Sequence, residues 1–118
     1  MKILVGDDDR VNQLVLQGML KKLGYECTVV GMGKDVVAHV SREPVDLIFL
    51  DVQMPDINGF DVVREIRNLP GISEASPKIA FVSGHDACDF RQELDELEVT
   101  LFLTKPVTVD GVRKIVES

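Results

Sequence analysis

Short apolar runs alternate along the chain with longer stretches in which apolar residues recur every three or four positions. The short runs, rich in β-branched residues, lie at 3–5, 28–30, 47–50, 79–82 and 101–103. Such runs are typical of strands that are buried on both faces of a sheet. The stretches that follow them, at 11–23, 36–40, 60–66, 90–97 and 109–116, carry apolar residues at helical spacing. The pattern therefore predicts five successive strand–helix units.

Strands that alternate with helices form a parallel sheet with helices on both faces, because each crossover packs its helix against the sheet. Gly24 is placed to end the first helix, and the second is expected to close before Pro44. The 118 residues contain no internal repeat and no linker-like stretch, so residues 1–118 are expected to form one domain. The predicted fold class is α/β, a doubly wound, parallel, five-stranded sheet of the flavodoxin-like (βα)5 kind with strand order 2-1-3-4-5.

Composition narrows the possible functions. The net charge is −7 and the basic residues form no cluster, which argues against nucleic-acid binding by this domain. The apolar runs are far too short to span a membrane, and the N-terminus does not resemble a signal peptide, so we expect a cytoplasmic domain without membrane contact. Cys27 and Cys88 have no CxxC spacing and are expected to be reduced structural thiols.

Side chains that can act as metal ligands, nucleophiles or proton donors lie at or just beyond the ends of all predicted strands except the second. Asp7 and Asp8 follow the first strand and Asp51 the third, while Ser83 and Lys105 follow the fourth and fifth. In the order 2-1-3-4-5 these strands are neighbours, and ligands of open α/β sheets bind at the carboxyl ends of the strands. We therefore expect these side chains to converge on one site.

Crowded carboxylates repel one another unless a cation neutralises them. A hard divalent ion such as Mg²⁺, which binds carboxylate, water and phosphate oxygens, is the natural counter-charge. Lys105 would add a second positive pole and Ser83 a hydrogen-bond donor, which together suit a phosphoryl group. The nucleophile would be a carboxylate oxygen of Asp51, which gives an aspartyl phosphate.

Four segments make a family resemblance specific. ILVGDDDRVNQ (3–13), DLIFLDVQMPDINGFD (46–61), FVSG (81–84) and FLTKP (102–106) resemble the receiver domains of two-component response regulators and hybrid histidine kinases. The similarity covers essentially the whole chain. It implies a phosphorelay receiver module that accepts a phosphoryl group from a phosphohistidine of a histidine kinase or histidine phosphotransfer protein. Such a module switches conformation to signal and is not a conventional enzyme, because it catalyses only its own phosphorylation and dephosphorylation.

The resemblance also assigns roles at the acidic end of the site. It implies that Asp51 is the phospho-acceptor and one of the Mg²⁺ ligands. Asp8 matches a direct ligand of the ion, and Asp7 matches a ligand that acts largely through water. Gln53 matches the position whose backbone carbonyl completes the metal site.

The remaining roles that the resemblance implies concern the switch. Ser83 matches the hydroxyl residue that moves to the phosphoryl group, and Lys105 the lysine that pairs with that group. Lys105 precedes Pro106, and this peptide bond is usually cis in the family. Phe102 matches the aromatic switch residue, whose ring turns inward when the hydroxyl moves. The fourth and fifth helices around Phe102 would form the output surface.

Other polar residues have simpler interpretations. Asp9 is expected to favour the start of the first helix through the helix dipole. Asp56, near the Asn58–Gly59 turn signal, is expected to serve the turn. His39 is expected on a helix surface, whereas His85 is near enough to Ser83 in sequence to influence hydrolysis.

The chain departs from the family pattern in three places. Gly6 stands where a larger strand residue is usual, and is expected to loosen the end of the first strand. The segment 97–101 lacks the usual glycine turn, and the loop at 70–77 is long.

Two other classes of protein use a similar strand-end site. A phosphohydrolase of the haloacid-dehalogenase kind needs a second aspartate two residues after the nucleophile, but Gln53 occupies that position and cannot donate a proton. A flavodoxin-type FMN protein needs backbone N–H groups and hydroxyls at its phosphate, where this chain has three aspartates. The sequence leaves open a stand-alone regulator or a receiver from a hybrid kinase, and residues 12–26 resemble hybrid-kinase receivers slightly more.

Overall fold

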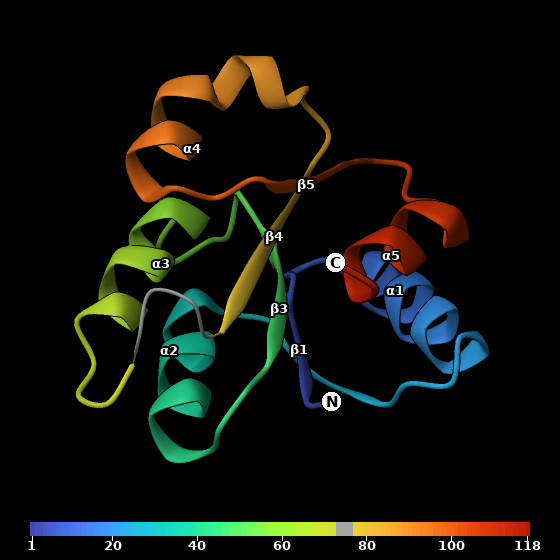
Figure 1. Cartoon of the computed structure of the whole chain (residues 1–118), viewed down its shortest axis with the longest axis horizontal. Coiled ribbons are helices and arrows are strands. Elements are labelled where there is room, and N and C mark those ends of the chain that lie inside the picture. The colour runs from blue at the N-terminus through green and yellow to red at the C-terminus, as the bar shows by residue number, and fades with distance from the viewer. Residues whose placement is uncertain (73–76) are drawn as a thin grey trace.

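A computed structural model describes residues 1–72 and 77–118 of the chain. In this part a five-stranded sheet has the order β2-β1-β3-β4-β5, and each pair of neighbours is parallel (Figure 1). The strands are β1 (Ile3–Gly6), β2 (Cys27–Val30), β3 (Leu47–Asp51), β4 (Lys78–Ser83) and β5 (Leu101–Thr104). The predicted fold class and strand order are confirmed.

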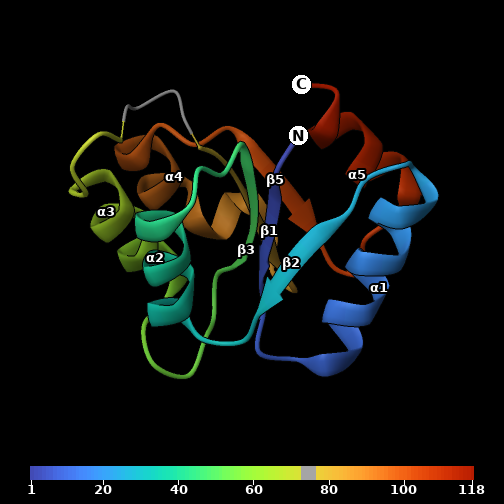
Figure 2. The same cartoon turned by 90° about the horizontal axis from the view of Figure 1, so that it is seen from below.

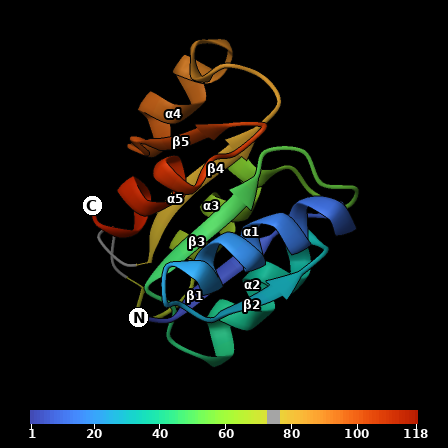
Figure 3. The ribbon, with the colours of Figure 1, turned by 90° about the vertical axis from the view of Figure 1, so that its right-hand side faces the viewer.

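Helices cover both faces of the sheet. They are α1 (Arg10–Lys22), α2 (Gly33–Arg42), α3 (Gly59–Arg67), α4 (Arg91–Leu97) and α5 (Val109–Val116). Helices α1 and α5 lie on one face and α2, α3 and α4 on the other (Figures 1 and 2). Figure 3, viewed from the side of α1 and α5, shows α1 packed over β1 and β2. The predicted fourth helix is found as α4, and a 3-10 turn, η1 (Ala87–Phe90), precedes it.

The sheet separates two apolar clusters, which explains why its central strands read as unbroken apolar runs. In β3, Ile48 and Leu50 pack into the cluster shared with α2 and α3. Phe49, between them in sequence, packs into the cluster shared with α1 and α5. All three residues are completely buried, as expected for a parallel strand covered on both faces.

Side-chain caps define where several helices begin. Asp9 is the N-cap of α1, and its Oδ1 accepts a hydrogen bond of 2.8 Å from the backbone N–H of Val11. Thr108 caps α5 in the same way by accepting from the N–H of Gly111. These bonds satisfy N–H groups that have no partner within the helix. The predicted N-terminal role of Asp9 is therefore confirmed, and it acts as a hydrogen-bonding cap as well as a charge.

Gly6 does not loosen the end of β1, so that prediction is wrong. The residue is buried and pairs in register with both Val30 and Leu50. A Cβ atom at this position would lie 2.7 Å from Cγ2 of Val36 on α2. The absence of a side chain is what allows α2 to pack closely over the end of β1.

The other two departures from the family pattern concern the turn at 97–101 and the loop at 70–77. Glu98, with φ of 55°, takes the left-handed conformation that ends α4, where glycine is the usual residue. The 70–77 loop lies partly outside the described residues.

Among helices of the described residues, none has the length and apolar character needed to cross a membrane.

Candidate functional site

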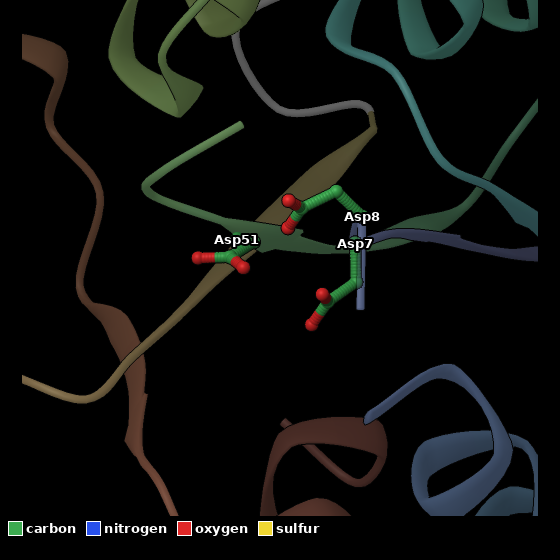
Figure 4. Close-up of side chains that lie close together, drawn as sticks. All are labelled: Asp7, Asp8 and Asp51. Atoms are coloured by element: carbon green, nitrogen blue, oxygen red, sulfur yellow. The ribbon is translucent and has the colours of Figure 1, made fainter. Parts of the chain in front are cut away.

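Three aspartates lie together at the carboxyl ends of β1 and β3 (Figure 4). One carboxylate oxygen of each of Asp7, Asp8 and Asp51 lies within 4.8 Å of the others. The register explains this proximity, because Gly6 pairs with Leu50 and the residue after each reaches the same edge of the sheet. The expected convergence of these strand-end carboxylates is therefore found.

The three carboxylates differ in burial and in hydrogen bonding. Asp7 and Asp51 are only 1% and 6% exposed, whereas Asp8 is exposed. Oδ1 of Asp7 accepts from the N–H of Asp9 at 2.9 Å, and Oδ1 of Asp51 accepts from the N–H of Gln53 at 3.0 Å. The second oxygen of Asp7, although buried, accepts no hydrogen bond from the described residues.

Lys105 provides the positive charge of the site. Its Nζ lies 3.2 Å from Oδ2 of Asp51 and 3.5 Å from Oδ2 of Asp7. The backbone N–H of Lys105 donates to the carbonyl oxygen of Ser83 at 2.7 Å, which ties the residue after β5 to the end of β4. The Lys105–Pro106 peptide bond is cis, as the resemblance implied.

Burial and repulsion act on Asp7 together. Burial raises the pKa of Asp7 above its ordinary value, and the neighbouring charge of Asp51 raises it further, against the bond from Asp9 and the attraction of Lys105. For Lys105, burial alone would lower the pKa, but the carboxylates of Asp51 and Asp7 raise it overall. Lys105 therefore stays a cation. The negative charge of ionised Asp7 is only partly offset by its neighbours.

This donor set fits a hard divalent cation. Carboxylate oxygens are ligands that Mg²⁺ prefers. Asp7, Asp8 and Asp51 offer three such groups within reach of one ion, one of them with a buried oxygen that the described residues leave without a hydrogen bond. A cation here would also offset the repulsion that raises the pKa of Asp7.

Ser83 and Gln53 flank the acidic cluster. Ser83 is buried at the end of β4, and its Oγ accepts from the backbone N–H of His85 at 3.1 Å. Gln53 is exposed, but its backbone lies against Asp51 through the hydrogen bond to Oδ1. Ser83 thus ends the strand next to β3, and Gln53 lies in the loop that directly follows β3.

An aromatic row connects β4, α3 and η1 with β5. Ring centroids are 5.1 Å apart for Phe81 and Phe60, 5.4 Å for Phe60 and Phe90, and 6.3 Å for Phe90 and Phe102. Phe102 is half-buried in β5. The exposed His85 also contacts this row, with its ring 6.1 Å from that of Phe90. Phe90 was predicted only as an apolar helix residue, and its helical spacing gave no sign of this central position.

Asp56 has a different role from the one that the sequence predicted. Its Oδ1 accepts from the N–H of Gly33 and its Oδ2 from the N–H of Lys34, both at 2.8 Å. It therefore caps α2 from the loop between β3 and α3. Hydrogen bonds to the N–H groups of Lys34 and Gly33 lower the pKa of Asp56, although its slight burial acts in the opposite direction.

The remaining predictions are only partly met. The side chain of His39 is 15% exposed and lies 3.7 Å from Glu43, so it is not on an open helix surface. Cys27 and Cys88 are free thiols. Burial raises the pKa of the Cys27 thiol, but Cys88 is exposed and is not a structural core thiol.

Fold and site together define a class, the flavodoxin-like α/β domains with an acidic site at the carboxyl edge of the sheet. Within that class the chain belongs to the response regulator receiver domain family, whose family model matches residues 3–117. It is therefore a receiver domain of two-component signalling.

Curated relatives carry this domain as a small part of longer proteins. The chain is 33% identical to the 3',5'-cyclic-nucleotide phosphodiesterase regA of Dictyostelium discoideum, over 100% of the chain and 15% of that protein. It is 32% identical to the sensor histidine kinase RcsC of Escherichia coli (strain K12), over 97% of the chain and 12% of that protein.

Solved structures support the same assignment. A CheY-like receiver domain from Methylobacillus flagellatus matches with a TM-score of 0.88 and 26% identity, over 99% of this chain and 96% of that one. The chemotaxis response regulator CheY4 of Vibrio cholerae shares the fold, with a TM-score of 0.86 and 24% identity over 98% of this chain and 95% of that one.

Proposed function

We propose that this receiver domain accepts a phosphoryl group on Asp51 in a Mg²⁺-dependent reaction. The donor would be a phosphohistidine on a histidine kinase or a histidine phosphotransfer protein. The observation that carries the proposal is the setting of Asp51, a buried carboxylate at a strand end that has two further aspartates within 4.8 Å and Lys105 Nζ at 3.2 Å.

In the transfer step, an oxygen of Asp51 forms a bond to phosphorus while the bond from phosphorus to the donor's imidazole nitrogen breaks. The electron pair of that bond stays on the imidazole, which takes up a proton as it leaves. Lys105 is already beside Asp51 and carries a charge that its raised pKa maintains. It stabilises the negative charge that spreads over the phosphoryl oxygens.

The residues that would hold Mg²⁺ are Asp8 and Asp51 directly, Asp7 largely through water, and Gln53 through its backbone carbonyl. When bound, the ion supplies neutralisation of the charge on the phosphoryl oxygens. Asp7 and Asp51 contribute buried carboxylates, whose repulsion favours cation binding.

Ser83 and Phe102 would convert phosphorylation into a change of shape. The Ser83 hydroxyl accepts from the N–H of His85, which leaves its proton free to be donated to a phosphoryl oxygen. Movement of the end of β4 would be passed to Lys105 through the backbone hydrogen bond between them and to Phe102 through the paired strands. The resulting population shift would alter the surface formed by α4, β5 and α5.

The exposed apolar face of α1 supports the proposal that the phosphoryl donor is a protein that docks there. Val11, Leu14 and Val15 are 67%, 51% and 39% exposed, a concentration of apolar area on one helix. A hollow of about 250 Å³ beside this face is lined by Val11, Val15, Lys105 and Pro106, among others. An apolar partner surface docked on α1 would therefore meet the rim of the acceptor site.

The test is intact-protein mass spectrometry after incubation with a small phosphodonor and Mg²⁺. We expect one phosphoryl adduct, stable in acid and labile in base, that Asp51→Asn abolishes. Asp35→Asn removes the same charge from the exposed first turn of α2 and should leave the adduct unchanged. Repeated turnover of a phosphate ester without any adduct would instead identify a phosphohydrolase.

A further inference from the structure

The loop between β3 and α3, residues 52–58, directly follows Asp51 and is attached to α2. Both oxygens of Asp56 take part, one accepting from the N–H of Gly33 and the other from the N–H of Lys34, each at 2.8 Å. These N–H groups belong to the first turn of α2 and have no acceptor within the helix. Met32, the cap residue of α2 itself, makes no side-chain cap hydrogen bond with the described residues.

A close backbone approach reinforces this attachment. A Cβ atom at Gly33 would lie 2.5 Å from Cγ1 of Ile57 and 3.2 Å from the carbonyl oxygen of Ile57. Only a glycine allows the first turn of α2 to approach the loop this closely. Figure 2 shows the light-green loop passing the first turn of α2. The middle of the loop is thus held by two kinds of contact with one helix end.

The two ends of the loop are held beside Asp51. The N–H of Gln53 donates to Oδ1 of Asp51 at 3.0 Å, and the N–H of Gly59 donates to the carbonyl oxygen of Val52 at 2.7 Å. The bond from Gln53 to Asp51 and the two bonds from α2 to Asp56 all have a carboxylate as acceptor, and they hold the loop at points three residues apart. The segment that carries the Gln53 carbonyl is therefore held from the Asp51 side and from the α2 side.

We propose that Asp56 is a positioning residue of the metal site, which holds the loop on α2 so that the backbone carbonyl of Gln53 stays beside Asp51. This inference rests on the proposed function, because it takes Gln53 as a backbone ligand of Mg²⁺. It gives Asp56 a purpose that a turn residue would not have. It also makes the N-terminus of α2 part of the frame of the site.

The first test compares Mg²⁺ affinities by NMR titration or calorimetry. Asp56→Ala removes both hydrogen bonds to α2, and we expect Mg²⁺ affinity to fall about tenfold, as for other residues that orient metal ligands. Asp56→Asn keeps one acceptor oxygen and should give an intermediate loss. Thr108→Ala is the matched control, since it removes a side-chain cap from α5 without touching the loop. That variant should lose stability but keep wild-type affinity.

A second readout needs no metal. In metal-free protein, amide hydrogen exchange at Gln53 should be faster in Asp56→Ala than in the wild type, and unchanged in Thr108→Ala. If Asp56→Ala does not fold, the Mg²⁺ affinity and the Gln53 exchange rate of Asp56→Asn are compared with those of the wild type instead. Wild-type Mg²⁺ affinity in both Asp56 variants, with normal exchange at Gln53, would reduce Asp56 to a helix cap and overturn this inference alone. A wild-type chain that binds no Mg²⁺ would instead overturn the proposed function, and this inference with it.

Discussion

Lys105 pairs with Asp51 across the site, with its ammonium nitrogen 3.2 Å from Oδ2 of the carboxylate. The pair joins the end of β3 to the residue after β5, although β4 lies between these strands. A change in the charge on Asp51 would therefore act on Lys105, whose backbone N–H donates to the carbonyl oxygen of Ser83 at the end of β4. In the metal-free protein the same lysine offsets part of the repulsion between Asp51 and Asp7.

The first prediction concerns Lys105→Ala. Because the lysine opposes the binding of a second cation, its loss should leave Mg²⁺ affinity at least as high as in the wild type. Phosphorylation should then fail to shift the conformation of α4 and β5, because the link between Asp51 and the end of β5 is gone. The measurement is the set of phosphorylation-induced NMR shifts in α4 and β5. Unaltered shifts would contradict the role, and Lys114→Ala on exposed α5 is the control.

Asp7→Asn should stabilise the metal-free protein. Burial raises the pKa of Asp7, so the folded state binds a proton more readily than the unfolded state and the ionised group costs stability at neutral pH. Asparagine removes this charge and keeps an oxygen to accept from Asp9. We expect a gain on the order of 1 kcal/mol in the free energy of unfolding at pH 7.

The pH dependence checks the cause of that gain. As pH falls through the raised pKa of Asp7 toward the unfolded value, the wild type regains the lost stability and the advantage of Asp7→Asn should shrink. Urea denaturation at several pH values measures this difference. Asp8→Asn, at an exposed position, should show a smaller effect. An advantage of Asp7→Asn that is constant with pH would point to packing rather than to charge.

Periodicity in the sequence was sufficient to predict most of the fold. Unbroken apolar runs such as 47–50 marked strands buried on both faces, because parallel sheets covered by helices require them. The residues that end those runs then predicted the meeting of Asp7, Asp8 and Asp51, since parallel neighbours end at the same edge of the sheet. At these positions the local apolar pattern predicted the same arrangement that the sheet topology shows.

The contacts that the sequence did not reveal join segments far apart along the chain. Asp56 bonds to residues 22 and 23 positions earlier, and nothing in its local turn sequence indicates α2 as the partner. Gly6 looked like a weak point because its neighbour Val36 cannot be identified from strand propensity. Phe90 likewise acquires its place in the aromatic row only when η1 folds back against β5.

Two glycines should respond in opposite directions to alanine. Gly59→Ala would place a Cβ atom 2.6 Å from the carbonyl oxygen of Asp51, so we expect a loss of about 1–3 kcal/mol in the free energy of unfolding. Gly18 lies at an exposed position within α1 with open space around it. Gly18→Ala should therefore gain about 0.5–1 kcal/mol from helix propensity. Urea denaturation measures both, and equal tolerance at both sites would contradict the close approach at Gly59.

The last prediction concerns the apolar face of α1. Leu14→Glu places a charge between Val11 and Val15 without altering a buried residue. If a phosphohistidine protein docks there, transfer from a purified, phosphorylated histidine phosphotransfer protein should slow about tenfold at subsaturating concentration, the effect of losing about 1.4 kcal/mol of binding. Phosphorylation by a small donor should keep its wild-type rate, because Asp51 and Lys105 are untouched.

The control and the contrary outcomes separate docking from chemistry. Gln92→Glu adds the same charge on exposed α4 and should leave both rates unchanged. Equal slowing with the small donor would show that Leu14→Glu disturbs the acceptor site itself. Unchanged transfer from the protein donor would place the docking surface elsewhere. A selective loss would show that α1 is the side from which the phosphoryl group reaches Asp51.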